Sequence, residues 1–127
     1  MPGKVLIIDD SLTNNVLIEN ILKSEGIESL VAYSGKEALK FLKQEKPSLI
    51  LLDIMMPEMD GFMFLEQIKK NKLNDIPVII ITAKDDIECI DRAKNAGVEN
   101  FILKPVDINK VIETVKKNLA LNEYYEN

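Results

Sequence analysis

Five polar residues stand where apolar runs of the sequence end, and their types could support metal binding and nucleophilic chemistry. Asp9 and Asp10 follow VLII, and Asp53 follows LILL. Thr82 follows VIII, and Lys104 closes NFILK. Adjacent carboxylates repel each other, so at least one of the first two is costly to keep ionised unless a cation binds. A carboxylate set without thiolate or imidazole prefers a hard cation such as Mg²⁺.

The composition narrows the chemistry further. The 127-residue chain contains no histidine, which excludes an imidazole base, metal ligand or phosphoacceptor in this chain. Its formal net charge of −5 argues against nucleic acid or an anionic membrane as the main partner. The single cysteine, Cys89, cannot form a disulfide within the chain. We therefore interpret it as a structural thiol and expect a cytoplasmic protein. The sequence predicts neither a membrane span nor a signal peptide.

The elements that must position these residues alternate along the chain. Short, continuous apolar runs are typical of strands covered on both faces. These runs are residues 4–8, 29–33, 49–52, 78–81 and 100–104. Helical spacing of apolar residues follows each run, and SGKE at 34–37 predicts a capping box at the start of the second helix. The apolar positions that predict the other helices are Val16, Leu17, Ile21 and Leu22; Phe62, Leu65 and Ile68; Ile87, Ile90 and Ala93; and Ile108, Val111, Ile112, Val115 and Leu119.

This order predicts an α/β fold, a single (βα)5 domain over residues 1–127 with a doubly wound parallel sheet. We expect the last six residues, 122–127, to form a loose tail. Each polar residue at a strand end has an ordinary explanation by itself, such as a helix cap or a strand terminator. Such explanations do not account for three carboxylates, a hydroxyl and an ammonium at the same edge of one sheet, where ligands of these folds bind.

At these positions the chain resembles the receiver domains of two-component response regulators, over essentially its whole length. The matching residues are the acidic pair in VLIIDDS, Asp53 in LILLDIMMPEMDG, Thr82-Ala83 in VIIITA and Lys104-Pro105 in FILKPVD. These residues taken together are specific to the receiver-domain family, whereas a lone DD or KP is not. The resemblance implies a flavodoxin-like strand order of 2-1-3-4-5.

The resemblance also implies a role for each residue. Mg²⁺ is held by Asp9, Asp10, Asp53 and the backbone carbonyl of Met55, and Asp53 is the nucleophile that accepts a phosphoryl group. Thr82 and Lys104 stabilise charge on the phosphoryl oxygens. Further implied features are a cis bond before Pro105 and a switch formed by Thr82 and Phe101.

The implied function is that of a phosphorelay receiver rather than an enzyme acting on a free substrate. A sensor histidine kinase or a histidine phosphotransfer protein donates the phosphoryl group, and the receiver assists its own phosphorylation and dephosphorylation. The fourth helix, fifth strand and fifth helix then present a changed surface to a downstream protein or a fused output domain. The sequence leaves open a phosphorylation-dependent homodimer and a receiver cut from a larger regulator or hybrid kinase. Less favoured alternatives are a Mg²⁺-dependent aspartyl phosphatase and a flavin- or nucleotide-binding module.

Overall fold

Five strands and five helices alternate along the chain in the computed structural model, which describes residues 3–56, 59–73, 75–83 and 86–126. The strands are β1 (Val5–Ile8), β2 (Ser29–Ala32), β3 (Leu49–Asp53), β4 (Val78–Ala83) and β5 (Asn100–Lys104). The helices are α1 (Leu12–Ser24), α2 (Gly35–Gln44), α3 (Gly61–Lys70), α4 (Ile87–Asn95) and α5 (Ile108–Glu126). The predicted alternation of strand and helix is confirmed. None of the helices in the described ranges combines the length and apolar character needed to cross a bilayer.

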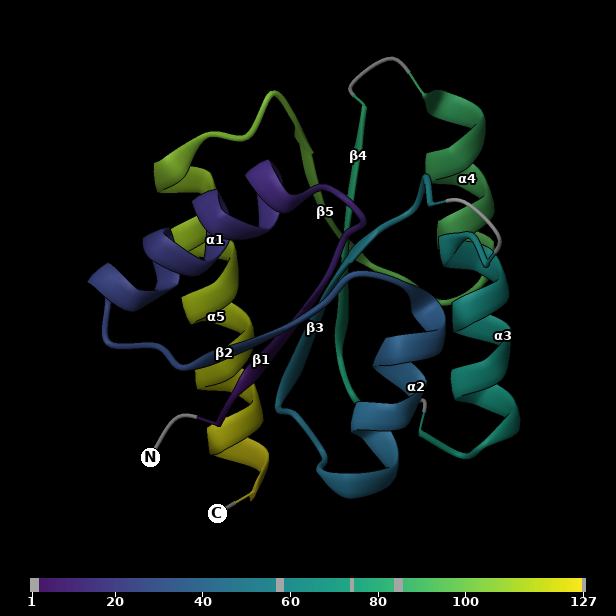
Figure 1. Ribbon diagram of the computed structural model, residues 1–127, viewed down its shortest axis with the longest axis horizontal. Coiled ribbons are helices and arrows are strands. Elements are labelled where there is room, and N and C mark those ends of the chain that lie inside the picture. Colours follow the sequence, from purple (N-terminus) through teal and green to yellow (C-terminus); the bar gives the residue numbers. More distant parts are fainter. Residues whose placement is uncertain (1–2, 57–58, 74, 84–85, 127) are drawn as a thin grey trace.

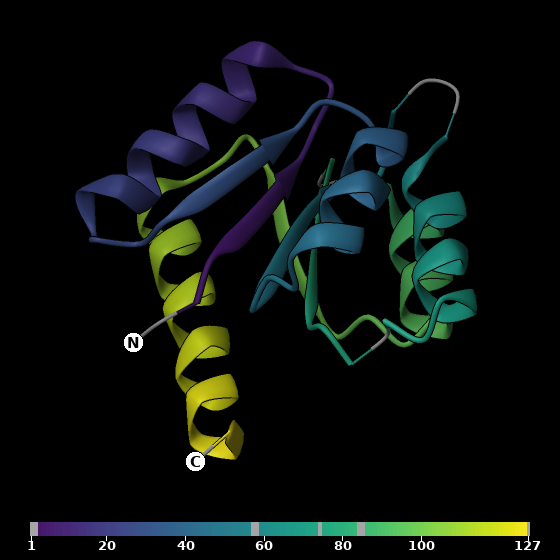
Figure 2. The same ribbon diagram turned by 60° about the horizontal axis from the view of Figure 1, so that its bottom comes forward.

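The strands form one parallel sheet in the order β2-β1-β3-β4-β5, which confirms the predicted flavodoxin-like order. Helices α1 and α5 cover one face of this sheet, and α2, α3 and α4 cover the other (Figures 1 and 2). All five strands run in the same direction, so their carboxyl ends meet at one edge of the sheet.

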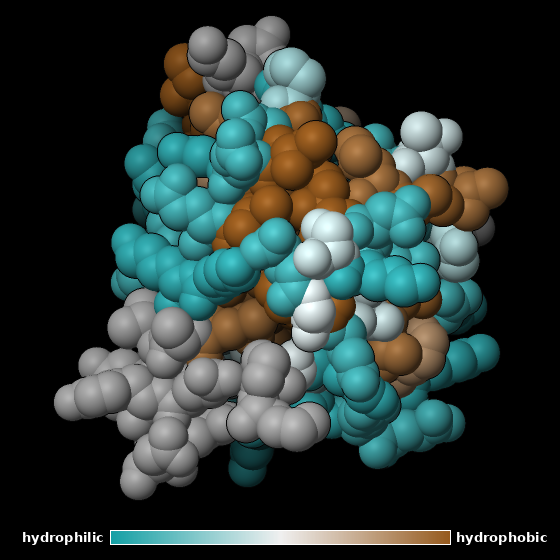
Figure 3. Space-filling model, turned by 90° about the vertical axis from the view of Figure 1, so that its left-hand side faces the viewer, coloured by the Kyte–Doolittle hydropathy of each residue, from teal (hydrophilic) through white to brown (hydrophobic). Residues whose placement is uncertain are grey.

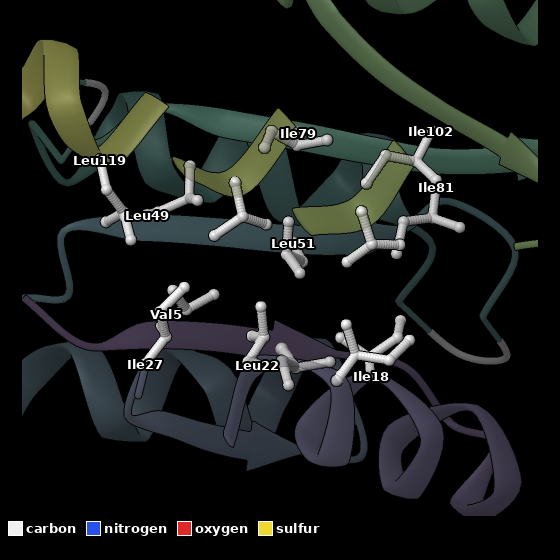
Figure 4. Packing of buried hydrophobic residues seen from close by; sticks show 14 residues of the cluster. Val5, Ile18, Leu22, Ile27, Leu49, Leu51, Ile79, Ile81, Ile102 and Leu119 are labelled. Carbon is white, nitrogen blue, oxygen red and sulfur yellow. The ribbon is translucent and has the colours of Figure 1, made fainter. Parts of the chain in front are cut away.

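Alternate residues of the central strands enter different cores. Val5 and Ile7 of β1 pack in a cluster with α1 and α5, whereas Leu6 and Ile8 pack in a second cluster with α2 and α3. Figure 4 shows the first cluster, in which side chains from the two helices meet those of the strands. Burial on both faces explains why the strands are continuous apolar runs in the sequence.

Local signals at the helix ends account for their bounds. The Ser34 hydroxyl accepts a hydrogen bond from the Glu37 amide, as the predicted capping box requires. The Glu37 carboxylate, however, accepts from the backbone N–H of Tyr33 rather than from that of Ser34. Gly26 and Gly97 follow α1 and α4 with φ angles of 73° and 95°, a region that glycine enters without steric cost.

Some apolar residues that predicted helices lie outside the core. Val16 and Leu17 of α1 are 46% and 40% exposed, while their neighbour Ile18 is buried. In α4, Ile87 is exposed and the buried residues are Cys89 and Ala93. The spacing therefore predicted these helices correctly, and Ile21, Leu22 and Ala93 lie on their buried faces, but not every apolar residue that it used is buried. In α5 the backbone is helical through Glu126, and the loose tail at 122–127 stays a prediction.

Candidate functional site

The residues singled out from the sequence lie at the carboxyl edge of the sheet. Asp9 and Asp10 directly follow β1, and Asp53 is the last residue of β3. Thr82 is the next-to-last residue of β4, and Lys104 ends β5. Parallel pairing aligns these ends, because Asp53 pairs with Ile81, and Ala83 pairs with Lys104.

Three carboxylates converge at this edge. One oxygen from each of Asp9, Asp10 and Asp53 lies within 4.8 Å of the others. Asp9 and Asp53 are buried, whereas Asp10 is exposed. The Oδ1 atom of Asp9 accepts a hydrogen bond of 2.9 Å from the Ser11 amide, but its buried Oδ2 atom has no partner among the described residues. A buried, unpartnered carboxylate oxygen beside two other carboxylates fits a site for a hard cation.

Asn15 is a residue of this region that the sequence analysis missed. It is buried in α1, and its side-chain amide donates a hydrogen bond of 2.7 Å to the backbone carbonyl of Asp9. This contact ties the first turn of α1 to the loop that carries the acidic pair. An asparagine in register with Ile18 and Leu22, on the buried face of the helix, is the sequence signal that could have revealed it.

Asp53 lies between opposing charges. Its Oδ1 atom accepts a hydrogen bond of 3.2 Å from the Met55 amide, and its Oδ2 atom lies 3.6 Å from the Lys104 ammonium nitrogen. Burial and the nearby Asp9 charge raise the pKa of Asp53 to about 6, against the opposing effects of Lys104 and the Met55 amide. Burial is the larger of the two causes that raise this pKa, and Asp9 is the neighbouring carboxylate that adds to it.

Thr82 and Phe101 lie on the side of the sheet that α4 covers. The Thr82 side chain is 2% exposed, and its hydroxyl has no hydrogen-bond partner in the described part of the chain. Phe101 is half-buried and packs against the cluster that contains Ile80 and Cys89. Met55 beside Asp53 exposes 69% of its surface. The Lys104–Pro105 peptide bond is cis.

The sequence matches the family model described as response regulator receiver domain over residues 5–116. The chain belongs to this family. As receiver domains are the phosphoacceptors of two-component signalling, the family result supports that general role. The aspartyl phosphatase and flavin-binding alternatives are therefore set aside.

The relatives differ in how much of their own length the match with this chain covers. Sporulation initiation phosphotransferase F of Bacillus subtilis is 36% identical over 121 residues, which cover 95% of this chain and 97% of that protein. Transcriptional regulatory protein ZraR of Salmonella typhimurium is 35% identical over 117 residues, which cover 91% of this chain but 26% of that protein. The family thus contains both proteins of about this length and longer proteins with further segments.

Solved structures of receivers share the fold closely. Chemotaxis protein CheY4 of Vibrio cholerae superimposes with a TM-score of 0.85 at 26% identity, covering 94% of this chain and 100% of that chain. NtrX of Brucella abortus gives a TM-score of 0.90 at 29% identity, covering 99% of this chain and 28% of that chain. Members of the family bind Mg²⁺ at an acidic pocket and interact with histidine kinases or phosphotransfer proteins. The Asp9, Asp10 and Asp53 cluster lies at the corresponding strand ends of this chain.

Proposed function

We propose that this receiver, extending over residues 1–127, accepts a phosphoryl group on Asp53 from a phosphohistidine of a sensor kinase or phosphotransfer protein. The observation that carries the proposal is the position of Asp53, buried between the Asp9 carboxylate and the ammonium of Lys104. A buried carboxylate with a pKa of about 6 remains mostly ionised near neutral pH. It is thus available as a nucleophile.

In the proposed transfer, a carboxylate oxygen of Asp53 forms a bond to phosphorus while the bond from phosphorus to the donor imidazole nitrogen breaks. The electron pair of that bond returns to the imidazole, and Asp53 becomes an acyl phosphate. Lys104, now 3.6 Å from Asp53, pairs with the phosphoryl oxygens, and the Thr82 hydroxyl donates a hydrogen bond to them. These groups act by position and charge, so the chain needs no histidine of its own.

The donor set at this edge fits Mg²⁺. Asp9, Asp10 and Asp53 would hold the ion, and the Met55 carbonyl is the fourth protein ligand that the resemblance implies. When bound, Mg²⁺ supplies positive charge that offsets the charge of the phosphoryl oxygens. The chain contributes the buried Oδ2 atom of Asp9, which has no hydrogen-bond partner among the described residues.

An apolar surface beside the site supports docking of the phosphodonor protein. Leu12 and Val16 lie one turn apart on α1 and are 63% and 46% exposed, and Ile108 at the start of α5 is 55% exposed. Leu12 follows the acidic pair by two residues. Figure 3, a view from the side that carries α1 and α5, shows hydrophobic residues in the middle of the face with hydrophilic residues beside them. A partner seated there would hold its phosphohistidine close to Asp53.

Output is proposed to pass through α4, β5 and α5 to a downstream protein or fused domain. Movement of the Thr82 hydroxyl toward the phosphoryl group would leave space on the α4 side of the sheet, and the Phe101 ring would fill it. Ile87 of α4 and Leu103 of β5 are exposed on these elements and would report the change to a partner. A homodimer formed through this surface after phosphorylation remains part of the proposal. We expect these events in the cytoplasm.

The test is phosphorylation by a small donor. Wild-type protein and Asp53→Asn are incubated with acetyl phosphate and Mg²⁺, and intact mass is measured. Wild type should gain one phosphoryl group and Asp53→Asn none. Asp75→Asn is the matched control, because Asp75 is an exposed aspartate paired with Lys46 away from the site, and it should be phosphorylated as wild type. The assignment of Asp53 would be contradicted if Asp53→Asn gained as much phosphate as wild type.

A further inference from the structure

Asn15 is a buried polar side chain on a helix face that is otherwise apolar. It lies on α1 with the buried residues Ile18, Ile21 and Leu22, and 1% of its surface is exposed. An apolar residue would suit this face at less cost, because a buried amide loses its hydrogen bonds to water. The contacts of the amide group, rather than its packing, therefore explain why an asparagine stands at this position.

The orientation of this amide is decided by the carbonyl that it contacts. The Nδ2 atom of Asn15 donates a hydrogen bond of 2.7 Å to the backbone carbonyl of Asp9, and both groups are buried. The opposite orientation would place two acceptor oxygens against each other. In the observed orientation, the buried Oδ1 atom of Asn15 has no hydrogen-bond partner among the described residues. An amide that contacts Asp9 while half of it stays unsatisfied indicates a role beyond stability of the fold.

Asp9 is held at several of its polar atoms, and Asn15 supplies one of these contacts. The backbone N–H of Asp9 donates a hydrogen bond of 3.1 Å to the carbonyl of Ala32 at the end of β2. The Oδ1 atom of Asp9 accepts from the Ser11 amide, and the carbonyl accepts from Asn15. These contacts leave the Oδ2 atom without a hydrogen-bond partner in the described part of the chain. The Asp9 carboxylate is thus oriented within the acidic cluster before any cation is present.

We propose that Asn15 is a positioning residue, and that its amide holds Asp9 in the orientation in which this carboxylate binds Mg²⁺. The hydrogen bond restricts rotation of the peptide unit that follows the Asp9 side chain. Asp9 is then ordered when the protein folds rather than when the cation binds, which raises the affinity of the site. This inference rests on the proposed Mg²⁺ site.

Asn15→Leu tests the role of the amide. Leucine has a branched side chain of similar shape, which suits the buried face of α1 but cannot donate a hydrogen bond to Asp9. The affinity for Mg²⁺, measured by an NMR titration, should fall about tenfold, the lower end of the range for removal of a group that orients a metal ligand. An affinity within about twofold of wild type would overturn the proposal.

Asn118→Leu is the matched control, because it removes the same kind of hydrogen bond far from the acidic cluster. Asn118 is buried on α5, and its amide donates a hydrogen bond of 2.8 Å to the Thr114 carbonyl. It also contacts Asn100, which begins β5 at the edge of the sheet opposite to the cluster. The Mg²⁺ affinity of Asn118→Leu should stay within about twofold of wild type. Equal losses of affinity in the two variants would overturn the proposal.

Exchange of the Ser11 amide with solvent tests the same role without Mg²⁺. This amide donates a hydrogen bond of 2.9 Å to Asp9 Oδ1, so its exchange rate depends on how well the Asp9 side chain is ordered. It should exchange faster in Asn15→Leu than in wild type and at the wild-type rate in Asn118→Leu. Equal rates in Asn15→Leu and wild type would overturn the proposal. If wild type does not bind Mg²⁺, the proposed metal site fails, and this comparison still decides the role of Asn15.

A measurement on the unsubstituted protein keeps the test independent of how Asn15→Leu folds. NMR follows exchange of the side-chain amide protons of Asn15 and Asn118 in wild type. The hydrogen bond to Asp9 should protect one Nδ2 proton of Asn15 in the metal-free protein, and saturating Mg²⁺ should slow its exchange further, because the two contacts of Asp9 stabilise each other. Exchange of the Asn118 amide should not respond to Mg²⁺. An Asn15 amide proton that exchanges as fast as an exposed one, or that does not respond to bound Mg²⁺, would overturn the proposal.

Discussion

Replacing Asp53 with asparagine should stabilise the metal-free protein near neutral pH. The Asp53 residue is 4% exposed, and burial together with Asp9 raises its pKa from an ordinary 3.8 to about 6. Keeping this carboxylate ionised in the fold therefore costs free energy. At about 1.4 kcal/mol for each pKa unit, the difference between 3.8 and about 6 corresponds to about 3 kcal/mol. Asparagine retains an oxygen that can accept the hydrogen bond from Met55 and carries no charge.

The direction of the pH dependence follows from proton binding. An acid with a higher pKa in the folded protein binds its proton more tightly there than in the unfolded chain. The contribution of Asp53 to stability is therefore fully present below about pH 4 and is lost as the pH rises through about 6. The gain in stability from Asp53→Asn should be near zero below about pH 4 and should reach its full value near pH 7.

The assay is urea denaturation of wild type and Asp53→Asn in EDTA across this pH range. Asp75→Asn is the control, since Lys46 lowers the pKa of the Asp75 carboxyl, and this substitution should give no gain near neutral pH. Saturating Mg²⁺ should reduce the advantage of Asp53→Asn, because ligand binding to the folded state stabilises wild type by about 2.7 kcal/mol at 100 times Kd. A lower stability of Asp53→Asn near neutral pH, or a gain that does not change with pH, would refute the reasoning.

Two further predictions concern the metal site and the switch. Asp10→Ala removes an exposed carboxylate of the cluster and should weaken Mg²⁺ binding at least about tenfold, or about 1.4 kcal/mol, in a titration followed by NMR; equal affinity would contradict its role as a ligand. Beryllofluoride with Mg²⁺ should turn the Thr82 hydroxyl toward the site and move the Phe101 ring inward, which paired structures or side-chain NMR spectra would detect. Unchanged rotamers of both residues would show that this receiver does not use the switch.

The sheet was predictable because its strands are buried on both faces. Continuous apolar runs predicted all five strands to within a residue or two at their ends, and polar residues after them predicted which edge carries the site. The buried faces of the helices were less predictable. Apolar residues at 16, 17 and 18 of α1 fit more than one helical face, and contacts with the sheet and α5 decide that Ile18 is the buried one. Position along one helix cannot supply that information.

The chemistry of the site was predictable by residue type but not by environment. Asp9 and Asp10 are equivalent in the sequence, yet one is buried and the other exposed. Burial and the nearby Asp9 charge raise the pKa of Asp53, a residue far from Asp9 along the chain. Burial and contacts between different strands and helices thus decide how each residue of the site behaves.

The resting protein contains polar atoms that the proposed phosphorylated state would satisfy. Asp9 Oδ2 and Thr82 Oγ1 are buried without a hydrogen-bond partner among the described residues, one where a cation would bind and the other near a phosphoryl group. A buried polar group left unsatisfied costs about 1–3 kcal/mol, so two of them correspond to about 2–6 kcal/mol. Reversal of a 1:99 equilibrium to 99:1 needs roughly 5.5 kcal/mol. Satisfaction of these two atoms would therefore contribute to the switch, and it reaches the size needed for a full reversal at the upper end of this range.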